Sequence, residues 1–190
     1  MVATLHRQRK SLLAFLPDTS VSGEVAAGAP IRGPHVRLAT KVLRAADPQT
    51  IGALQQPWTS VDNDSQGTAP DGLLGKEHPH PRTYGTFPRI LRKYVREEHL
   101  LTLEEAIRKF TALPGPTMRL TNRGVLKQGM WADVVVFDPD AIRDVATFEK
   151  PNQLAIGMSY VLVNGVPVIA EGKMTDALPG SVVRGPVIAL

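Results

Sequence analysis

Five side chains that can take part in catalysis or binding lie close together in this sequence. The carboxylates Asp62 and Asp64 come first, and His78, His80 and Arg82 follow. A carboxylate or an imidazole held at a site can accept and return a proton, and a guanidinium binds a carboxylate through paired hydrogen bonds. The residue types therefore favour acid–base chemistry. The alternative is that the two aspartates only cap a turn, as aspartates in loops commonly do.

The segment around these residues has the composition of a long surface loop. Residues 57–89 are rich in glycine and proline, which favour turns over helices and strands. Just before the aspartates, residues 58–61 have the pattern of a short strand. Carboxylates at the carboxyl end of a strand are a common arrangement in α/β active sites. This stretch is therefore the first candidate for a functional site.

The same stretch carries a family resemblance. PWTSVDNDSQGTAPDG followed by HPHPRTYGTFPRILRKYVREE resembles the carboxyl-terminal part of the N-acyl-D-amino-acid deacylases, or D-aminoacylases, of the amidohydrolase superfamily. The resemblance runs from about residue 45 to about residue 186. It implies an α/β plus β fold, namely a carboxyl-terminal fragment of a metal-dependent β/α barrel joined to a small β-sandwich domain.

The resemblance also divides the chain into three parts. Residues 1–44 form an unrecognised basic head, which we expect to be poorly ordered. Residues 45–119 are expected to hold the last barrel strand, the active-site loop and two covering helices. Residues 120–190, with RGVLKQGMWADVVVFD and VLVNGVPV, resemble the small β-sandwich with which many amidohydrolases end.

Members of this family hydrolyse the amide bond of N-acyl-D-amino acids with metal-activated water, and the metal is usually zinc. The resemblance places the proton-transferring aspartate at Asp64, with Asp62 as the alternative. His80 and Arg82 are expected to bind the substrate, Arg82 through a carboxylate. His78 and His80 form a His-x-His pair, but two prolines surround it in a loop rather than on a strand, so no metal ligand is predicted here.

The chain is expected to be incomplete as an enzyme. A zinc site takes about three protein ligands, and this sequence offers one plausible acid. We therefore predict that the chain alone neither binds zinc tightly nor hydrolyses N-acyl-D-amino acids, and that a complementing barrel polypeptide could supply the rest. The alternative is a non-catalytic β-domain that serves as an interaction module, or an inactive remnant.

Two helices are expected in the middle of the chain, both packed on a sheet. The first begins at Pro88 and continues through apolar residues at helical spacing. The second begins with a capping box formed by Thr102 and Glu105, and Pro114 ends it.

Strands are expected in the last third of the chain. Residues 131–138 and 160–169 are rich in valine and isoleucine, and Asn164-Gly165 predicts a type I′ hairpin turn. Residues 123–129 are expected to add a turn and a further short strand. Aspartates at strand ends, such as Asp133 and Asp138, are expected to hold turns rather than to take part in chemistry.

Charge and composition narrow the possible partners. The net charge of +4 belongs to residues 1–46, which carry seven basic and two acidic residues, while the remainder is nearly balanced. Because these basic residues are scattered, no nucleic-acid partner is predicted. The chain has no cysteine and no apolar run long enough to cross a membrane, so we expect a cytoplasmic protein with no membrane contact.

Overall fold

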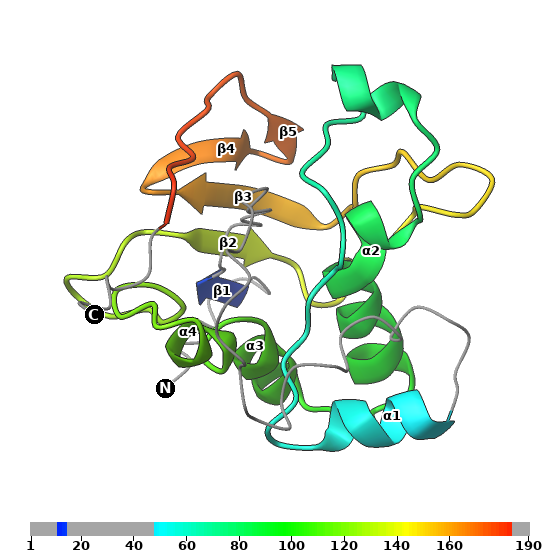
Figure 1. Ribbon diagram of the computed structural model, residues 1–190, viewed down its shortest axis with the longest axis vertical. Helices are drawn as coiled ribbons and strands as arrows, with labels where there is room; N and C mark the ends of the chain where they lie inside the picture. The colour runs from blue at the N-terminus through cyan, green and yellow to red at the C-terminus, as the bar shows by residue number, and fades with distance from the viewer. Residues whose placement is uncertain (1–10, 15–47, 184–190) are drawn as a thin grey trace, which may run out of the picture.

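The computed structural model describes residues 11–14 and 48–183, which form one antiparallel sheet with helices at one side of it (Figure 1). The strands follow one another in the order β1-β2-β3-β4-β5, and each is antiparallel to its neighbours. The strands are β1 (Ser11–Ala14), β2 (Val134–Phe137), β3 (Met158–Val163), β4 (Val166–Ala170) and β5 (Lys173–Met174).

Helical segments precede most of the sheet in sequence and share a core with it. They are α1 (Pro48–Gln55), η2 (Leu73–Lys76), α2 (Arg82–Arg89), η3 (Ile90–Glu97), α3 (Leu103–Phe110) and α4 (Pro114–Thr117). Tyr94, Ile107 and Phe110 from the helices are buried in one cluster with Val135 and Phe137 of β2. The prediction that the helices cover a sheet is confirmed.

The capping residue predicted for the second helix is confirmed. The Thr102 hydroxyl accepts a hydrogen bond from the Glu105 backbone N–H at 3.2 Å, and α3 begins at Leu103. The Glu105 carboxylate does not complete the box, because it pairs with Arg108 in the next turn. The helix ends at Phe110, and Pro114 begins the short α4 rather than ending α3.

The first predicted helix begins earlier than expected. Helix α2 starts at Arg82 directly after Pro81, so Pro88 lies inside it rather than at its first position. Proline has no N–H to donate to the carbonyl one turn back, which disturbs the helical hydrogen-bond ladder. The chain continues as the π-helical η3, in which the Glu98 N–H reaches back five residues to the Lys93 carbonyl at 2.8 Å.

The hairpin predicted at Asn164-Gly165 is confirmed. Asn164 has φ 52° and Gly165 has φ 84°, the two positive values that a type I′ turn requires, and the turn joins β3 to β4. Glu171 and Gly172 repeat this pair of positive φ values between β4 and β5, a turn that the sequence patterns did not single out. The short strand predicted within 123–129 is wrong, because that segment forms bends and a turn.

Residues 58–61, expected as a last barrel strand, form no strand within the described part of the chain. The segment is irregular, and one backbone hydrogen bond, from Val61 N–H to the Lys109 carbonyl at 3.3 Å, ties it to α3. A strand needs a neighbouring strand to exchange ladder hydrogen bonds, and none of the described strands lies beside it. Residues 11–14 and 48–183 form neither a barrel nor a second sheet, so those finer features remain predictions.

Most of the basic head lies outside the described residues. Only Ser11–Ala14 of the basic head is described, and it forms the edge strand β1 beside β2. The expected poor order of the rest of residues 1–44 therefore stays a prediction. Within the described part, no helix is both long enough and apolar enough to cross a membrane.

Gly157 provides a test of close packing beside the sheet. Its φ is 94°, and an added Cβ would lie 2.6 Å from the backbone N and Cα of Ile142. Gly157→Ala is therefore expected to lower the free energy of unfolding by about 2–5 kcal/mol, from backbone strain and a steric clash together. Gly129→Ala is the matched control: φ is 86° there, but no described heavy atom lies within 4 Å of the added Cβ. Urea unfolding should show that Gly129→Ala lowers the free energy of unfolding by about 1–2 kcal/mol. Equal losses in the two variants would contradict the steric clash expected at Gly157.

Candidate functional site

Loop residues from Asp64 onward lie along the first turn of α2. The Asp64 carboxylate forms an ion pair with the Arg82 guanidinium at 3.0 Å. The hydroxyls of Ser65 and Thr83 are hydrogen-bonded at 2.7 Å, and those of Thr68 and Tyr84 at 3.0 Å. The structure therefore brings together two of the residues that the sequence proposed, Asp64 and Arg82. It adds four hydroxyl groups that the sequence analysis missed, because no local pattern marks them.

The loop conformation presents Asp64 to solvent. Its side chain is 46% exposed, and its backbone φ of 47° lies in the left-handed region, which aspartate tolerates better than most residues. Asp62 is exposed as well, and its Oδ1 accepts a hydrogen bond from the Asn63 N–H at 2.7 Å. Between them, Asn63 is buried. Both carboxylates therefore lie at the surface, and the guanidinium of Arg82 pairs with Asp64.

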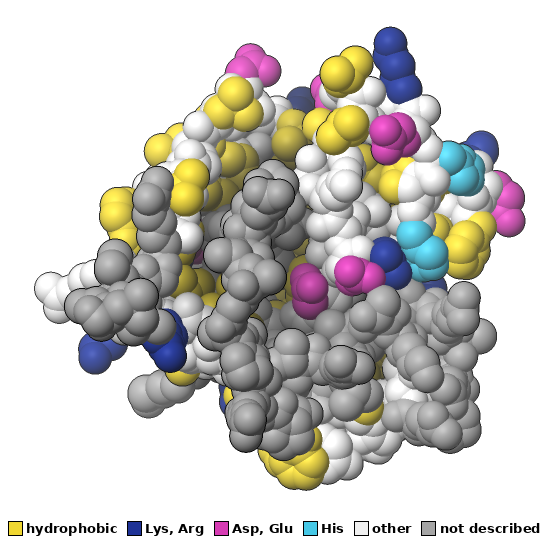
Figure 2. Space-filling model, in the orientation of Figure 1, with side chains coloured by type: hydrophobic (Ala, Val, Ile, Leu, Met, Phe, Trp, Pro, Cys, Tyr) yellow, Lys and Arg dark blue, Asp and Glu magenta, His cyan; other side chains and the backbone are white. Residues whose placement is uncertain are grey.

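Figure 2 shows acidic, basic and histidine side chains next to one another on the face toward the viewer. His80 continues this polar surface, because its Nδ1 accepts a hydrogen bond from the Arg82 backbone N–H at 3.1 Å. Its ring also packs edge-on against Phe148, with ring centroids 5.0 Å apart. Asp64, Arg82 and His80 are thus linked in a row, although they approach from two different segments.

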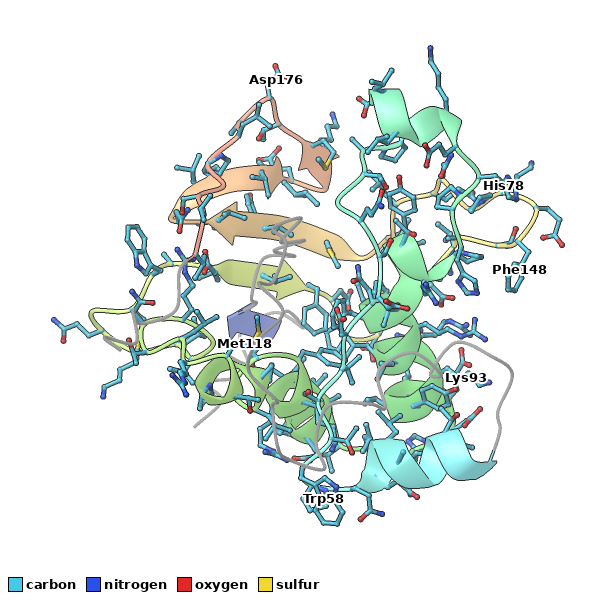
Figure 3. The ribbon with its side chains drawn as sticks, in the orientation of Figure 1. Trp58, His78, Lys93, Met118, Phe148 and Asp176 are labelled. Carbon is cyan, nitrogen blue, oxygen red and sulfur yellow. The ribbon has the colours of Figure 1, made fainter. Side chains whose placement is uncertain are left out.

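His78 contacts the backbone of Phe148. Its Nε2–H donates to the Phe148 carbonyl at 2.7 Å, and Figure 3 shows the two residues at the same end of the molecule. His78 and His80 thus both contact Phe148, one through the backbone and one through the ring. The His-x-His pair is thereby tied to the connection between β2 and β3.

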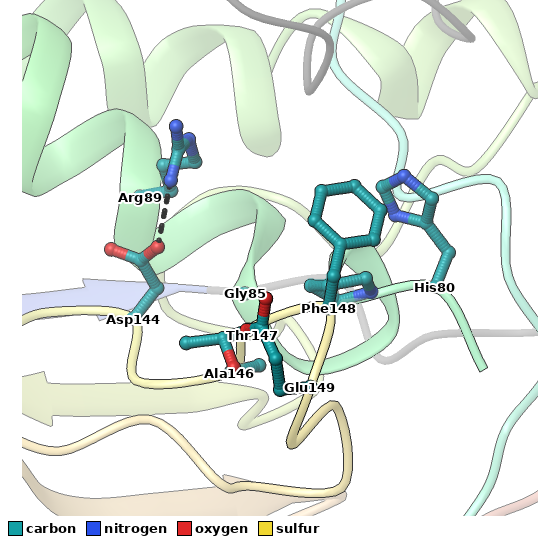
Figure 4. A pocket seen from close by; sticks show the side chains of 9 residues that line it. His80, Gly85, Arg89, Asp144, Ala146, Thr147, Phe148 and Glu149 are labelled. Carbon is teal, nitrogen blue, oxygen red and sulfur yellow. Dashed lines mark hydrogen bonds and ion pairs between the residues drawn. The ribbon is translucent and has the colours of Figure 1, made fainter. Parts of the chain in front are cut away.

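A pocket of about 270 Å³ lies between the start of α2 and the loop that joins β2 to β3 (Figure 4). His80, Gly85 and Arg89 line it from the α2 side, and Asp144 and Phe148 line it from the loop. Asp144 is nearly buried, and its Oδ2 accepts a hydrogen bond from Arg89 at 3.2 Å. The pocket thus marks where the two segments meet, beside the row that holds Arg82 and Asp64.

Hydrogen bonds from α3 hold the backbone of residues 56–61, which precedes the two aspartates. The side chain of Lys109 is fully buried. Its ammonium donates hydrogen bonds to the carbonyls of Gln56 and Thr59, the latter at 3.2 Å. Arg108 donates to the Pro57 carbonyl, and the Lys109 carbonyl accepts from Val61 N–H. Two consecutive residues of α3 therefore fix the segment that replaces the expected strand.

The buried ammonium predicts a pH-dependent contribution to stability. Burial lowers the pKa of Lys109 below its ordinary 10.5, although Glu105 opposes this shift. In the window just below pH 10.5 the unfolded chain then binds more protons than the folded chain, so stability rises with pH. Urea unfolding at roughly pH 8 and pH 10 should show this gain in the wild type and not in Lys109→Met. The same pH response in both proteins would contradict the assignment.

A metal site would need several ligating side chains gathered at one place. Residues 11–14 and 48–183 contain no group of three or more His, Cys, Asp or Glu side chains placed to hold a metal ion. Zinc takes about three protein ligands, so these residues do not fit a zinc ion by themselves. No catalytic step is assigned to a metal on this chain.

The two strand-end aspartates hold structure, as the sequence predicted. Asp133 is buried, pairs with Arg123, and accepts a hydrogen bond from the Asn164 N–H at 2.9 Å. Asp138 accepts from the Asp140 N–H at 2.9 Å and so closes a turn. These contacts hold the sheet and a turn in place.

Comparison with known proteins agrees with the resemblance in the site region. Residues 62–169 match the model of a family described as "Amidohydrolase family". From Alcaligenes xylosoxydans xylosoxydans, an N-acyl-D-glutamate deacylase is 48% identical over 60% of this chain, and an N-acyl-D-aspartate deacylase is 50% identical over 59%. The chain spans 23% and 22% of these two relatives, about a quarter of their length.

Solved structures give the same result. A D-aminoacylase described as having a binuclear metal center matches 70% of this chain with 39% sequence identity and a TM-score of 0.61, over 26% of its own length. An N-acyl-D-glutamate deacylase from Bordetella bronchiseptica, solved with zinc and a phosphonate inhibitor, matches 67% of the chain with 42% identity and a TM-score of 0.56, also over 26% of its length. Since the family model covers more than half of its residues, this chain belongs to the amidohydrolase family.

Proposed function

We propose that this chain forms part of a hydrolase that cleaves the amide bond of N-acyl-D-amino acids. The observation that carries the proposal is the row of Asp64, Arg82 and His80, which lies within the matched family region. The similar proteins named as deacylases of N-acyl-D-glutamate and N-acyl-D-aspartate support the substrate class. Both substrates carry carboxylates, for which a guanidinium is a suited partner.

Each residue of the row has a proposed role. Asp64 accepts a proton from the water that attacks the amide carbonyl and returns it to the leaving amine. Arg82 binds a carboxylate of the substrate through its guanidinium. The ion pair with Asp64 holds this guanidinium next to the proposed proton acceptor. His80 orients the start of α2 and lines the substrate side of the row. Zinc in such an enzyme would be held by residues other than those described, and a complementing barrel polypeptide is the proposed source.

The alternative function is a non-catalytic β-domain that binds another protein, or an inactive remnant. The sheet gives one observation in its favour, because β3, β4 and β5 carry exposed apolar side chains, namely Tyr160, Val166 and Met174. The strand register places Tyr160 and Met174 on opposite faces of the sheet, so a partner would contact these side chains singly rather than as one patch.

One experiment separates these functions. The 190-residue chain is assayed for release of D-glutamate from N-acetyl-D-glutamate with zinc, alone and mixed with the N-acyl-D-glutamate deacylase relative truncated before its matching segment. We expect hydrolysis in the mixture that a chelator abolishes, and none from the chain alone. Association without hydrolysis would favour the interaction module. Chelator-sensitive turnover by the chain alone would overturn the prediction that it is incomplete.

A further inference from the structure

We propose that Asn152 and His78 are positioning residues that fasten the loop carrying His80 and Arg82 to the connection between β2 and β3. The inference rests on the proposed function in assigning the row of Asp64, Arg82 and His80 to substrate binding. It extends that function to Phe148 and Asn152, which lie about 70 positions away in sequence from the loop that they contact.

The loop before the site is a compact unit with few attachments of its own. Gly72, Gly75 and Glu77 donate backbone hydrogen bonds to the carbonyls three residues back, at 3.0–3.2 Å. Gly75 is required there, because a Cβ would collide with the carbonyl oxygens of Ala69 and Pro70. The outer side of the unit faces solvent, with Leu73 83% exposed. Such a unit moves as one piece unless it is attached elsewhere.

Asn152 provides the attachment at one end. Its Nδ2 donates to the Gly75 carbonyl at 2.6 Å and to the Glu77 carbonyl at 2.9 Å. The Asn152 Oδ1 is buried and has no hydrogen-bond partner. The opposite amide orientation would place that oxygen against two carbonyls, so the two acceptors fix which way the side chain faces. A buried acceptor without a partner is unfavourable, and the two hydrogen bonds from Nδ2 offset this cost.

His78 provides the second attachment, and from there the contacts continue to the site. His78 donates to the Phe148 carbonyl, and the Phe148 ring packs against His80. His80 then accepts from the Arg82 N–H at the start of α2, and the Arg82 side chain pairs with Asp64. The connection between β2 and β3 thereby fixes, through one continuous set of contacts, where the guanidinium lies relative to the carboxylate.

Two variants test this positioning role. Asn152→Asp replaces the donor with an oxygen that repels both carbonyls, and His78→Ala breaks the other attachment at an exposed residue. Asn122→Asp is the matched control, because it makes the same chemical change at an exposed asparagine away from the loop. Hydrogen exchange of the full chain, measured by mass spectrometry, reports the loop directly and does not depend on activity.

Both variants are expected to speed amide exchange in residues 72–80 about tenfold, while exchange in α3 and the sheet stays as in the control. In the mixture that hydrolyses N-acetyl-D-glutamate, they should raise KM about tenfold with kcat changed less than about threefold. Unchanged exchange in both variants would overturn the proposal. Faster exchange with unchanged KM would leave the attachment in place but overturn its role in substrate binding. If Asn152→Asp fails to fold, the exchange rates and KM of His78→Ala alone decide whether the proposal holds.

Discussion

Asp64→Asn is expected to reduce hydrolysis of N-acyl-D-amino acids by the complemented enzyme about 10²–10⁴-fold. Asparagine keeps the size of the side chain and one oxygen that can accept a hydrogen bond from Arg82, but it cannot take up a proton at neutral pH. The ion pair at 3.0 Å lies at the surface, so its loss should change stability by less than about 1 kcal/mol. Initial rates at saturating substrate, together with a thermal melt of each variant, measure the two effects separately.

The matched control is Asp62→Asn. Asp62 is two residues away, is also exposed, and contacts the backbone of its neighbour rather than Arg82. Its replacement should cost less than about tenfold in rate. If the effects of the two variants are exchanged, the proton-transfer role moves to Asp62. If neither variant loses activity, the proposed role of the loop carboxylates is wrong.

Asp133→Ala is expected to lower the free energy of unfolding by about 3–5 kcal/mol. The side chains of Asp133 and Arg123 are 3% and 5% exposed, so removal of the carboxylate leaves a buried guanidinium without its charge partner. The variant also loses the acceptor for the Asn164 N–H, which lies in the turn between β3 and β4. Urea unfolding at neutral pH, with the slope compared with that of the wild type, measures the loss.

Two further variants decide whether the charge is responsible. Glu98→Ala removes an exposed partner 3.6 Å from Lys93 and should cost less than about 1 kcal/mol. Asp133→Ala combined with Arg123→Met removes both buried charges and should recover part of the lost stability. A loss below about 1 kcal/mol for Asp133→Ala alone would show that the buried pair contributes little.

The features that the sequence predicted well are those encoded within a few neighbouring residues. The Thr102 cap depends on a hydroxyl three residues before the N–H that it accepts from, and the Asn164-Gly165 turn depends on two residues that tolerate positive φ. The segment from Pro81 to Pro88 misled the same reasoning. Its glycine and proline disfavour a helix, yet Gly85 packs against Asp144, where an added Cβ would lie 3.3 Å from the aspartate Cβ. Tertiary contact therefore outweighs local propensity there.

The amino-acid sequence was enough to predict the family, the cap of α3 and the hairpin, and to propose Asp64, His80 and Arg82 as site residues. It was enough because these features depend on residue types at short, fixed spacing. The packing of separate segments establishes that Arg82 pairs with Asp64 rather than Asp62, and that His78 contacts Phe148. The same packing brings Asn152 to the carbonyls of Gly75 and Glu77. Contacts of this kind depend on how separate segments pack, and no spacing along the chain records that.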